Sequence, residues 1–236
     1  MNDFTNQLLN NLNSLVTGLF LLTAFGIVAM RQARGVLDLF IVQSLLLAAS
    51  AVLLGLRFSS EHLFGVAAVN VISKPIIVPW LLRKTSPSEV YTRREVQQVL
   101  NIPTALLIAL ALAILAYFLG LPLLKAVGPE FRSPNVPIGI AGLLLGAFTI
   151  TVRREALPLL IGLLAMENGA FLAGIAIARN LPMLIELAIA TDGLIIVFIM
   201  GVLTRAVQKQ IGTTAVGELA TLKEATVEPV EKEVVK

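Results

Sequence analysis

Long apolar segments follow one another along the chain, separated by short polar loops. Each is close to the roughly 20 residues that an α-helix needs to cross a hydrocarbon core of about 30 Å. The alternating ten-residue segments of a transmembrane β-barrel do not occur. The pattern therefore predicts an all-α, polytopic transmembrane protein with about seven spans, at residues 14–30, 35–56, 63–82, 102–124, 136–152, 156–178 and 181–207.

The composition agrees with this interpretation and narrows the chemistry. Of the 236 residues, 57% are hydrophobic and 14% are charged, whereas a soluble domain has about 25% charged residues. The chain has no cysteine and a single histidine, His62, which excludes disulfides, iron–sulfur ligation and thiol nucleophiles. No patch combines basic and aromatic residues, so we expect no nucleic-acid partner. We expect the chain to have no cofactor, no metal site and no catalytic centre of its own.

The loops predict the orientation in the membrane. Loops on one side carry ten Lys and Arg residues before the C-terminal tail is counted, and loops on the other side carry four. The positive-inside rule then places the N-terminus outside and the C-terminus in the cytoplasm, in the cytoplasmic (inner) membrane. The first residues lack a basic region before the apolar run, which argues against a cleaved signal peptide.

Besides Asp38 and Arg205 near span ends and the phenol of Tyr117, four ionisable residues fall inside the predicted spans. They are Lys74 in the third span, Glu167 in the sixth, and Glu186 and Asp192 in the seventh. A charged side chain at the bilayer centre costs roughly 2.5–3.5 kcal/mol or more, so such residues face protein or water and mark ion or proton paths. Pro75, directly after Lys74, has no N–H to donate and predicts a broken third helix.

These residues favour proton handling over metal binding. Glu186 and Asp192 are about 9 Å apart along a helix axis and roughly 120° apart around it, so they do not form a chelating pair. Buried carboxylates can exchange protons near neutral pH. We therefore predict Glu167 as the principal protonation site, with Asp192, Glu186 and Lys74 as its relay or charge partners. In the alternative interpretation, Lys74 pairs with one acid and only fixes helix packing.

Three further polar residues are candidates for supporting the site. Asn168 follows Glu167 directly and can hydrogen-bond it or an ordered water. Gln43 lies deep in the second span, where a hydrogen bond to a neighbouring helix is its expected role. Asp38 is expected in the first turn of that helix, where the helix dipole favours an anion.

The last three spans carry recognisable sequence. RRE at 153–155 is followed by LPLLIGLLAMENGAFLAG and then by IELAIATDGLIIVFIMGVLTR. This part resembles the three-helix K-type subunit of complex I, and the whole chain resembles the hydrogenase-4 component E family, upstream through Gln43 and the Lys74–Pro75 stretch. The K-type acids correspond here to Leu164, one turn from Glu167, and to Thr191, which precedes Asp192. The piece GELATLKE in the tail also resembles this family.

The resemblance implies a subunit of a complex I-like [NiFe]-hydrogenase or formate hydrogenlyase-type assembly. Its partners would be antiporter-like and hydrogenase-anchoring membrane chains, which would hold all metal and redox chemistry of this oxidoreductase. The expected parts are a four-span region at 1–135, a K-type three-helix region at 136–211 and a largely disordered cytoplasmic tail at 212–236. The expected function is proton translocation; the alternatives are a structural docking subunit and a cation/proton antiporter component.

The predicted orientation can be tested with reporters. The ten-to-four bias of basic residues between the two sets of loops places the C-terminus in the cytoplasm. A reporter that is active only in the cytoplasm, fused after Lys236, should therefore be active. Activity of an exclusively periplasmic reporter at the same position would refute the orientation.

Overall fold

The computed structural model describes residues 3–85, 100–126, 134–177 and Phe198. Within these ranges the chain is helical and contains no strand, and six helical segments are long and apolar enough to cross a membrane. The predicted class, an all-α multi-span membrane protein, is confirmed. The elements in order are α1 (Asp3–Ala29), α2 (Ala33–Phe58), α3 (Glu61–Val71), η1 (Ile72–Ile77), α4 (Val78–Thr85), α6 (Ile102–Ala126), α7 (Asn135–Val152) and α8 (Ala156–Ile177).

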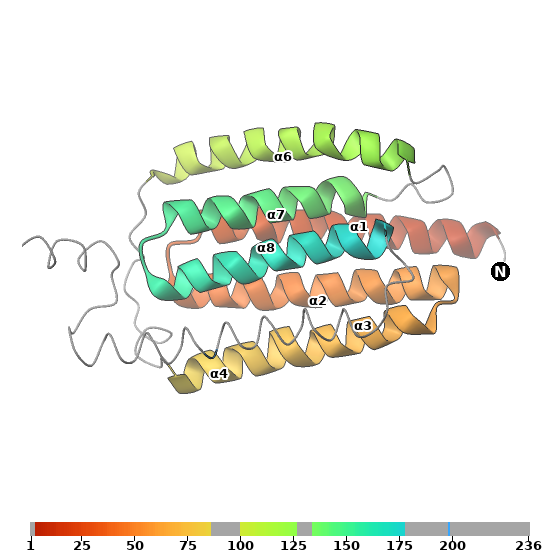
Figure 1. Cartoon of the computed structure of the whole chain (residues 1–236), viewed down its shortest axis with the longest axis horizontal. Coiled ribbons are helices and arrows are strands. Elements are labelled where there is room, and N and C mark those ends of the chain that lie inside the picture. Colours follow the sequence, from red (N-terminus) through yellow and green to blue (C-terminus); the bar gives the residue numbers. More distant parts are fainter. Residues whose placement is uncertain (1–2, 86–99, 127–133, 178–197, 199–236) are drawn as a thin grey trace, which may run out of the picture.

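The helices run side by side as a bundle (Figure 1). Helix α8 packs against α7 and α2, and α1 packs against α2 and α7. The continuous α3–η1–α4 segment covers α2 on one side, and α6 covers α7 and α1 on the other. Much of α6 is exposed, including Leu107, Phe118 and Leu119, as expected for a helix that faces lipid or a partner.

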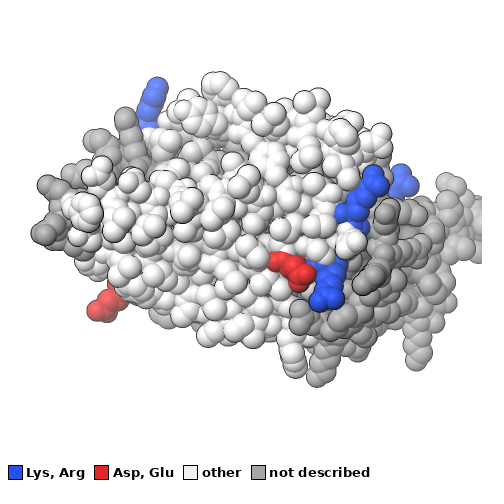
Figure 2. All heavy atoms as spheres, turned by 180° about the vertical axis from the view of Figure 1, so that it is seen from behind, with Lys and Arg blue, Asp and Glu red and all other residues white. Residues whose placement is uncertain are grey.

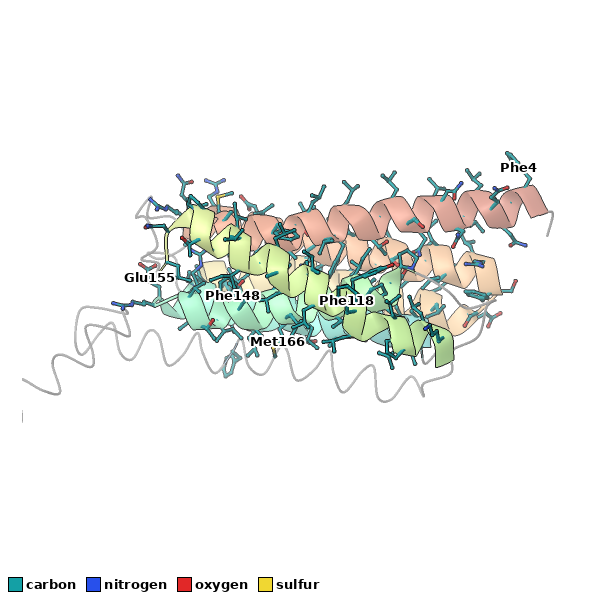
Figure 3. The ribbon with its side chains drawn as sticks, turned by 90° about the horizontal axis from the view of Figure 1, so that it is seen from above. Phe4, Phe118, Phe148, Glu155 and Met166 are labelled. Carbon is teal, nitrogen blue, oxygen red and sulfur yellow. The ribbon has the colours of Figure 1, made fainter. Side chains whose placement is uncertain are left out.

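The predicted spans agree with the helices at most ends, with one clear exception. The first helix begins at Asp3, well before the predicted start at residue 14. Asparagines in its first turns lowered the apolar signal of this region, but Asn10 accepts a 2.9 Å hydrogen bond from Arg57 of α2. Phe4 lies at the projecting end of α1, opposite the Glu155 end of the bundle (Figure 3). The predicted seventh span and the tail lie outside the described residues.

The sequence predicted a break in the third helix at Pro75. The regular α-helix is interrupted there, although the chain does not leave the helical path. It forms instead a π-helical segment, η1, and the α-helix resumes in α4. The Val78 N–H donates to the carbonyl of Ser73, five residues back, which is the wider hydrogen-bond pattern of a π-helix. The wider turn accommodates the missing N–H of Pro75 while the helix continues across the bundle.

Helices α7 and α8 approach each other at backbone distance. Gly139, Gly142 and Gly146 line α7 and face Gly169 and its neighbours on α8. A Cβ atom added to Gly169 would overlap the backbone of Gly142 and Leu143. Small residues at this spacing allow the close packing on which association of membrane helices depends. The Gly- and Ala-rich helix α7 therefore packs closely against α8.

A closed ring of hydrogen bonds joins α1, α2 and α7. Asn13 donates to Asn135 at 2.6 Å, Asn135 donates to Ser50 at 2.7 Å, and Ser50 donates back to Asn13 at 2.7 Å. All three side chains are buried. Because the ring joins three helices and contains no titratable group, we interpret this cluster as a structural contact between helices.

At the opposite end of the bundle, Arg153 binds the C-terminus of α1. Its Nη2 group donates to the carbonyls of Ile27, Val28 and Met30, which the end of a helix leaves without intrahelical partners. Burial lowers the pKa of Arg153 to about 10, and the charge of Glu155 partly opposes this shift. The guanidinium therefore stays protonated at neutral pH and fixes the α7–α8 turn to α1.

Two of the loops rich in Lys and Arg lie at the same end of the bundle, as expected for helices that alternate in direction. The turn between α1 and α2 and the turn between α7 and α8 share one end of the bundle (Figure 1). Lys and Arg side chains gather at that end of the face shown in Figure 2, and the surface between the two ends is almost free of charge. The orientation of this end relative to the cytoplasm remains a prediction.

The glycine contact between α7 and α8 can be tested with a matched pair on α8. Gly169→Ala introduces a Cβ that overlaps backbone atoms, whereas a Cβ at Gly174 meets no atom within 4 Å. Overpacking costs typically 1–3 kcal/mol, so Gly169→Ala should lower the Tm of the purified protein by several degrees. Gly174→Ala should leave the Tm unchanged or raise it slightly, because Ala favours helices over Gly. Equal Tm values for the two variants would contradict the close packing.

Candidate functional site

The third span and α8 bring a lysine and a glutamate together in the interior of the bundle. Lys74 lies in η1 with 5% of its side chain exposed, and its Nζ atom is 2.9 Å from Oε1 of Glu167 on α8. About one fifth of the Glu167 side chain is exposed. No further donor among the described residues binds this carboxylate oxygen. The ion pair therefore supplies the main partner of the carboxylate.

Asn168 provides a second oxygen for the same ammonium. Lys74 Nζ donates to Asn168 Oδ1 at 2.7 Å. On its other side, Asn168 Nδ2 donates to Ser44 Oγ at 3.0 Å and to Gln43 Oε1 at 3.3 Å, both on α2. The chain of hydrogen bonds thus runs from α2 through α8 to η1.

The lysine ammonium can only donate hydrogen bonds. This determines which way the side-chain amides of Asn168 and Gln43 are turned in the network. The Asn168 oxygen must face Lys74, so its nitrogen must face α2. Gln43 must then present its oxygen to Asn168, which leaves Gln43 Nε2 buried and without an acceptor among the described residues. The network is polarised in one direction and ends at Gln43.

Two apolar clusters enclose the polar layer along the bundle axis. On α8, Leu164 belongs to one cluster and Leu172 to the other, with Glu167 and Asn168 between them. On α2, Phe40 and Leu47 flank Gln43 in the same way. The fully buried polar atoms are therefore separated from both ends of the bundle by packed side chains. Among the described residues, Glu167 is the partly exposed member of the ion pair.

The structure brings together four of the seven predicted site residues. These are Lys74, Glu167, Asn168 and Gln43. Glu186 and Asp192 lie outside the described residues, so their predicted relay role remains a prediction.

Asp38 is not part of the site, and its predicted place in the first turn of α2 is wrong. The helix begins at Ala33, which puts Asp38 in its second turn. There its carboxylate lies 4.0 Å from the exposed side chain of Arg34, one turn away. Exposed pairs of this kind contribute little to stability. Within the described ranges, Asp38 makes no hydrogen bond or ion pair with Lys74 or Glu167.

Sequence reasoning missed Ser44 and Phe171. Ser44 is fully buried and binds Asn168, and the Phe171 ring centroid lies 5.9 Å from Lys74 Nζ. Ser44 could have been predicted from the sequence, because it forms an adjacent polar pair with Gln43 inside an otherwise apolar span. Phe171 could have been predicted from its spacing, because it lies four residues, or one turn of α8, after Glu167.

The chemistry of this arrangement is that of an ion pair inside the bundle, with its ammonium hydrogen-bonded to Asn168. No three His, Cys, Asp or Glu side chains in the described part of the chain come close enough to hold a metal ion. A buried carboxylate beside an ammonium can instead hold its charge, or lose it by taking up a proton when the ammonium moves.

Comparisons with known proteins agree with the resemblance found in the sequence. The chain is 29% identical to hydrogenase-4 component E of Escherichia coli K12 over 227 residues, which cover 92% of this chain and 98% of that protein. It is 27% identical to the uncharacterized protein Rv0085 of Mycobacterium tuberculosis over 198 residues, which cover 84% of this chain and 90% of that protein. No family model and no solved structure matches the chain. The predicted resemblance is therefore confirmed for component E: this multi-pass membrane protein is a relative of hydrogenase-4 component E over almost its whole length.

Proposed function

We propose that this chain is an integral membrane subunit of a membrane-bound, complex I-like hydrogenase assembly and that it moves protons through the Glu167–Lys74 pair. The similarity to hydrogenase-4 component E supports the first part. The assembly would lie in the cytoplasmic membrane, with antiporter-like and hydrogenase-anchoring chains as neighbours. Those chains would carry the redox centres, because this sequence has no cysteine.

The observation that carries the proposal is the buried ion pair in an apolar bundle. Lys74 and Glu167 are in contact at 2.9 Å, at a level where both neighbouring layers are hydrophobic. A pair of this kind is weak evidence for stability, because the cost of removing both charges from water offsets much of their attraction. Ionisable groups inside membrane helices more often lie on ion or proton pathways.

The proposed step uses the distance between the two charges. While Lys74 contacts Glu167, the ammonium stabilises the carboxylate and the acid holds no proton. When a neighbouring subunit draws Lys74 away, the isolated carboxylate takes up a proton from its exposed side. The return of Lys74 stabilises the carboxylate again and releases the proton. Asp192 and Glu186 are the proposed next stations.

A purely structural subunit is the second candidate. The Asn13–Ser50–Asn135 ring, which we interpret as a structural contact, supports this candidate because it also joins helices through buried polar side chains. The two clusters differ in one respect, since the ring contains no titratable group. Proton transfer therefore distinguishes the candidates, and assembly of the complex does not.

Glu167→Gln is the most direct test of this role. Glutamine keeps the shape and an oxygen that accepts from Lys74, so the complex should assemble normally. It cannot titrate, and a positioned acid or base contributes roughly 10²–10⁴-fold to the rate of proton transfer. The number of protons moved per electron pair should therefore fall well below that of the unmodified complex. The measurement is proton uptake by inside-out vesicles together with the hydrogenase rate.

Glu61→Gln is the matched control. Glu61 is an exposed acid in the first turn of α3 and has no link to the pair, so its replacement should leave the proton yield unchanged. If a fully assembled Glu167→Gln complex moves protons at the normal yield, the residue has only a structural role.

A further inference from the structure

Lys74 has a second acceptor whose direction the protein controls. Its ammonium carries three N–H groups, and two oxygens contact it from consecutive residues of α8, Glu167 at 2.9 Å and Asn168 at 2.7 Å. Only the first of these oxygens belongs to a titratable group. The capacity of the Asn168 oxygen to accept from Lys74 therefore does not depend on the protonation state of Glu167.

Helix α2 determines which end of the Asn168 amide faces Lys74. A rotated amide would aim its N–H groups at the ammonium and its oxygen at α2. Two acceptors on α2, Ser44 Oγ and Gln43 Oε1, bind the Asn168 nitrogen and oppose that rotation. All three side chains are fully buried, so water does not compete for these bonds.

We infer that Asn168 is the positioning residue of the ion pair, and that Ser44 and Gln43 hold its amide oxygen toward Lys74 so that the ammonium stays charged beside Glu167. This inference rests on the proposed function for its biological meaning, although the geometry of the pair does not depend on proton movement. Without the Asn168 oxygen, the buried ammonium has one acceptor fewer. The pair then shifts toward its neutral form, in which the proton of Lys74 has moved to the Glu167 carboxylate.

The protonation state of Glu167 can be read without turnover. Dicyclohexylcarbodiimide is lipid-soluble and modifies protonated carboxyl groups, and peptide mass spectrometry of the assembled complex measures the modified fraction of Glu167 at neutral pH. Asn168→Leu keeps the branched shape of the side chain, with a somewhat larger volume, and removes the oxygen. It should raise the initial labelling rate roughly tenfold, as expected for loss of a hydrogen bond to a charged group.

Ser44→Ala acts only through Asn168 and should have a smaller effect. We expect an increase of about two- to threefold, the size of a neutral hydrogen bond, and Ser44→Thr should restore the low rate because it keeps the hydroxyl. In the Asn168→Leu background, Ser44→Ala should change nothing further, since residues that act through one contact are not additive. Ser50→Ala is the matched control on the same helix, with equal burial but a place in the Asn13–Asn135 ring. Its labelling rate should equal that of the unmodified protein.

The possible results are decisive for the positioning role. An unchanged labelling rate in assembled Asn168→Leu complex overturns it, and so does an equal rate in Ser44→Ala and Ser50→Ala. If Asn168→Leu does not assemble, the comparison of the three serine variants decides alone. Labelling does not require proton transport, so a normal proton yield in Glu167→Gln would refute the proposed function and leave this result unaffected.

Discussion

A lysine ammonium buried in an apolar helix bundle needs oxygen atoms around it, and much of this structure provides them. Lys74 is surrounded by packed side chains with hydrophobic layers on both sides. Moving such a charge from water into the membrane is costly unless acceptors replace the water. Helix α8 supplies two of them, and α2 holds one of these two in the required direction. The third span, α8 and α2 must therefore keep a fixed register.

The helix packing is consistent with that requirement. The glycine contact brings α8 against α7, and Arg153 ties the turn between them to the end of α1. The π-helical segment leaves Lys74 facing the interior while the third span continues past Pro75. A π-helix within an α-helix is found frequently at functional sites, and here it carries the buried charge.

The sequence predicted the class of fold and the residues of the ion pair because both depend on composition. Long apolar segments indicate spans, and isolated charges inside them stand out. It did not predict the partners of Asn168, because the pairing of Ser44 with residue 168 depends on how α2 and α8 pack. It placed an irregularity at Pro75, where the π-helical segment lies, because the missing N–H is a local property. The form of the irregularity was not predictable in the same way, since it depends on how the rest of the third span packs. Asp38 was assigned to the first turn because the helix begins before the apolar run does.

The central claim is that Glu167 changes its protonation state during turnover. Infrared difference spectroscopy of the intact complex, recorded between its oxidised and reduced states, measures this change directly through the carbonyl band of a protonated carboxyl group. We expect a carboxyl band that changes with redox state and is absent from the difference spectrum of Glu167→Gln. Identical carboxyl bands in the two proteins would contradict the claim.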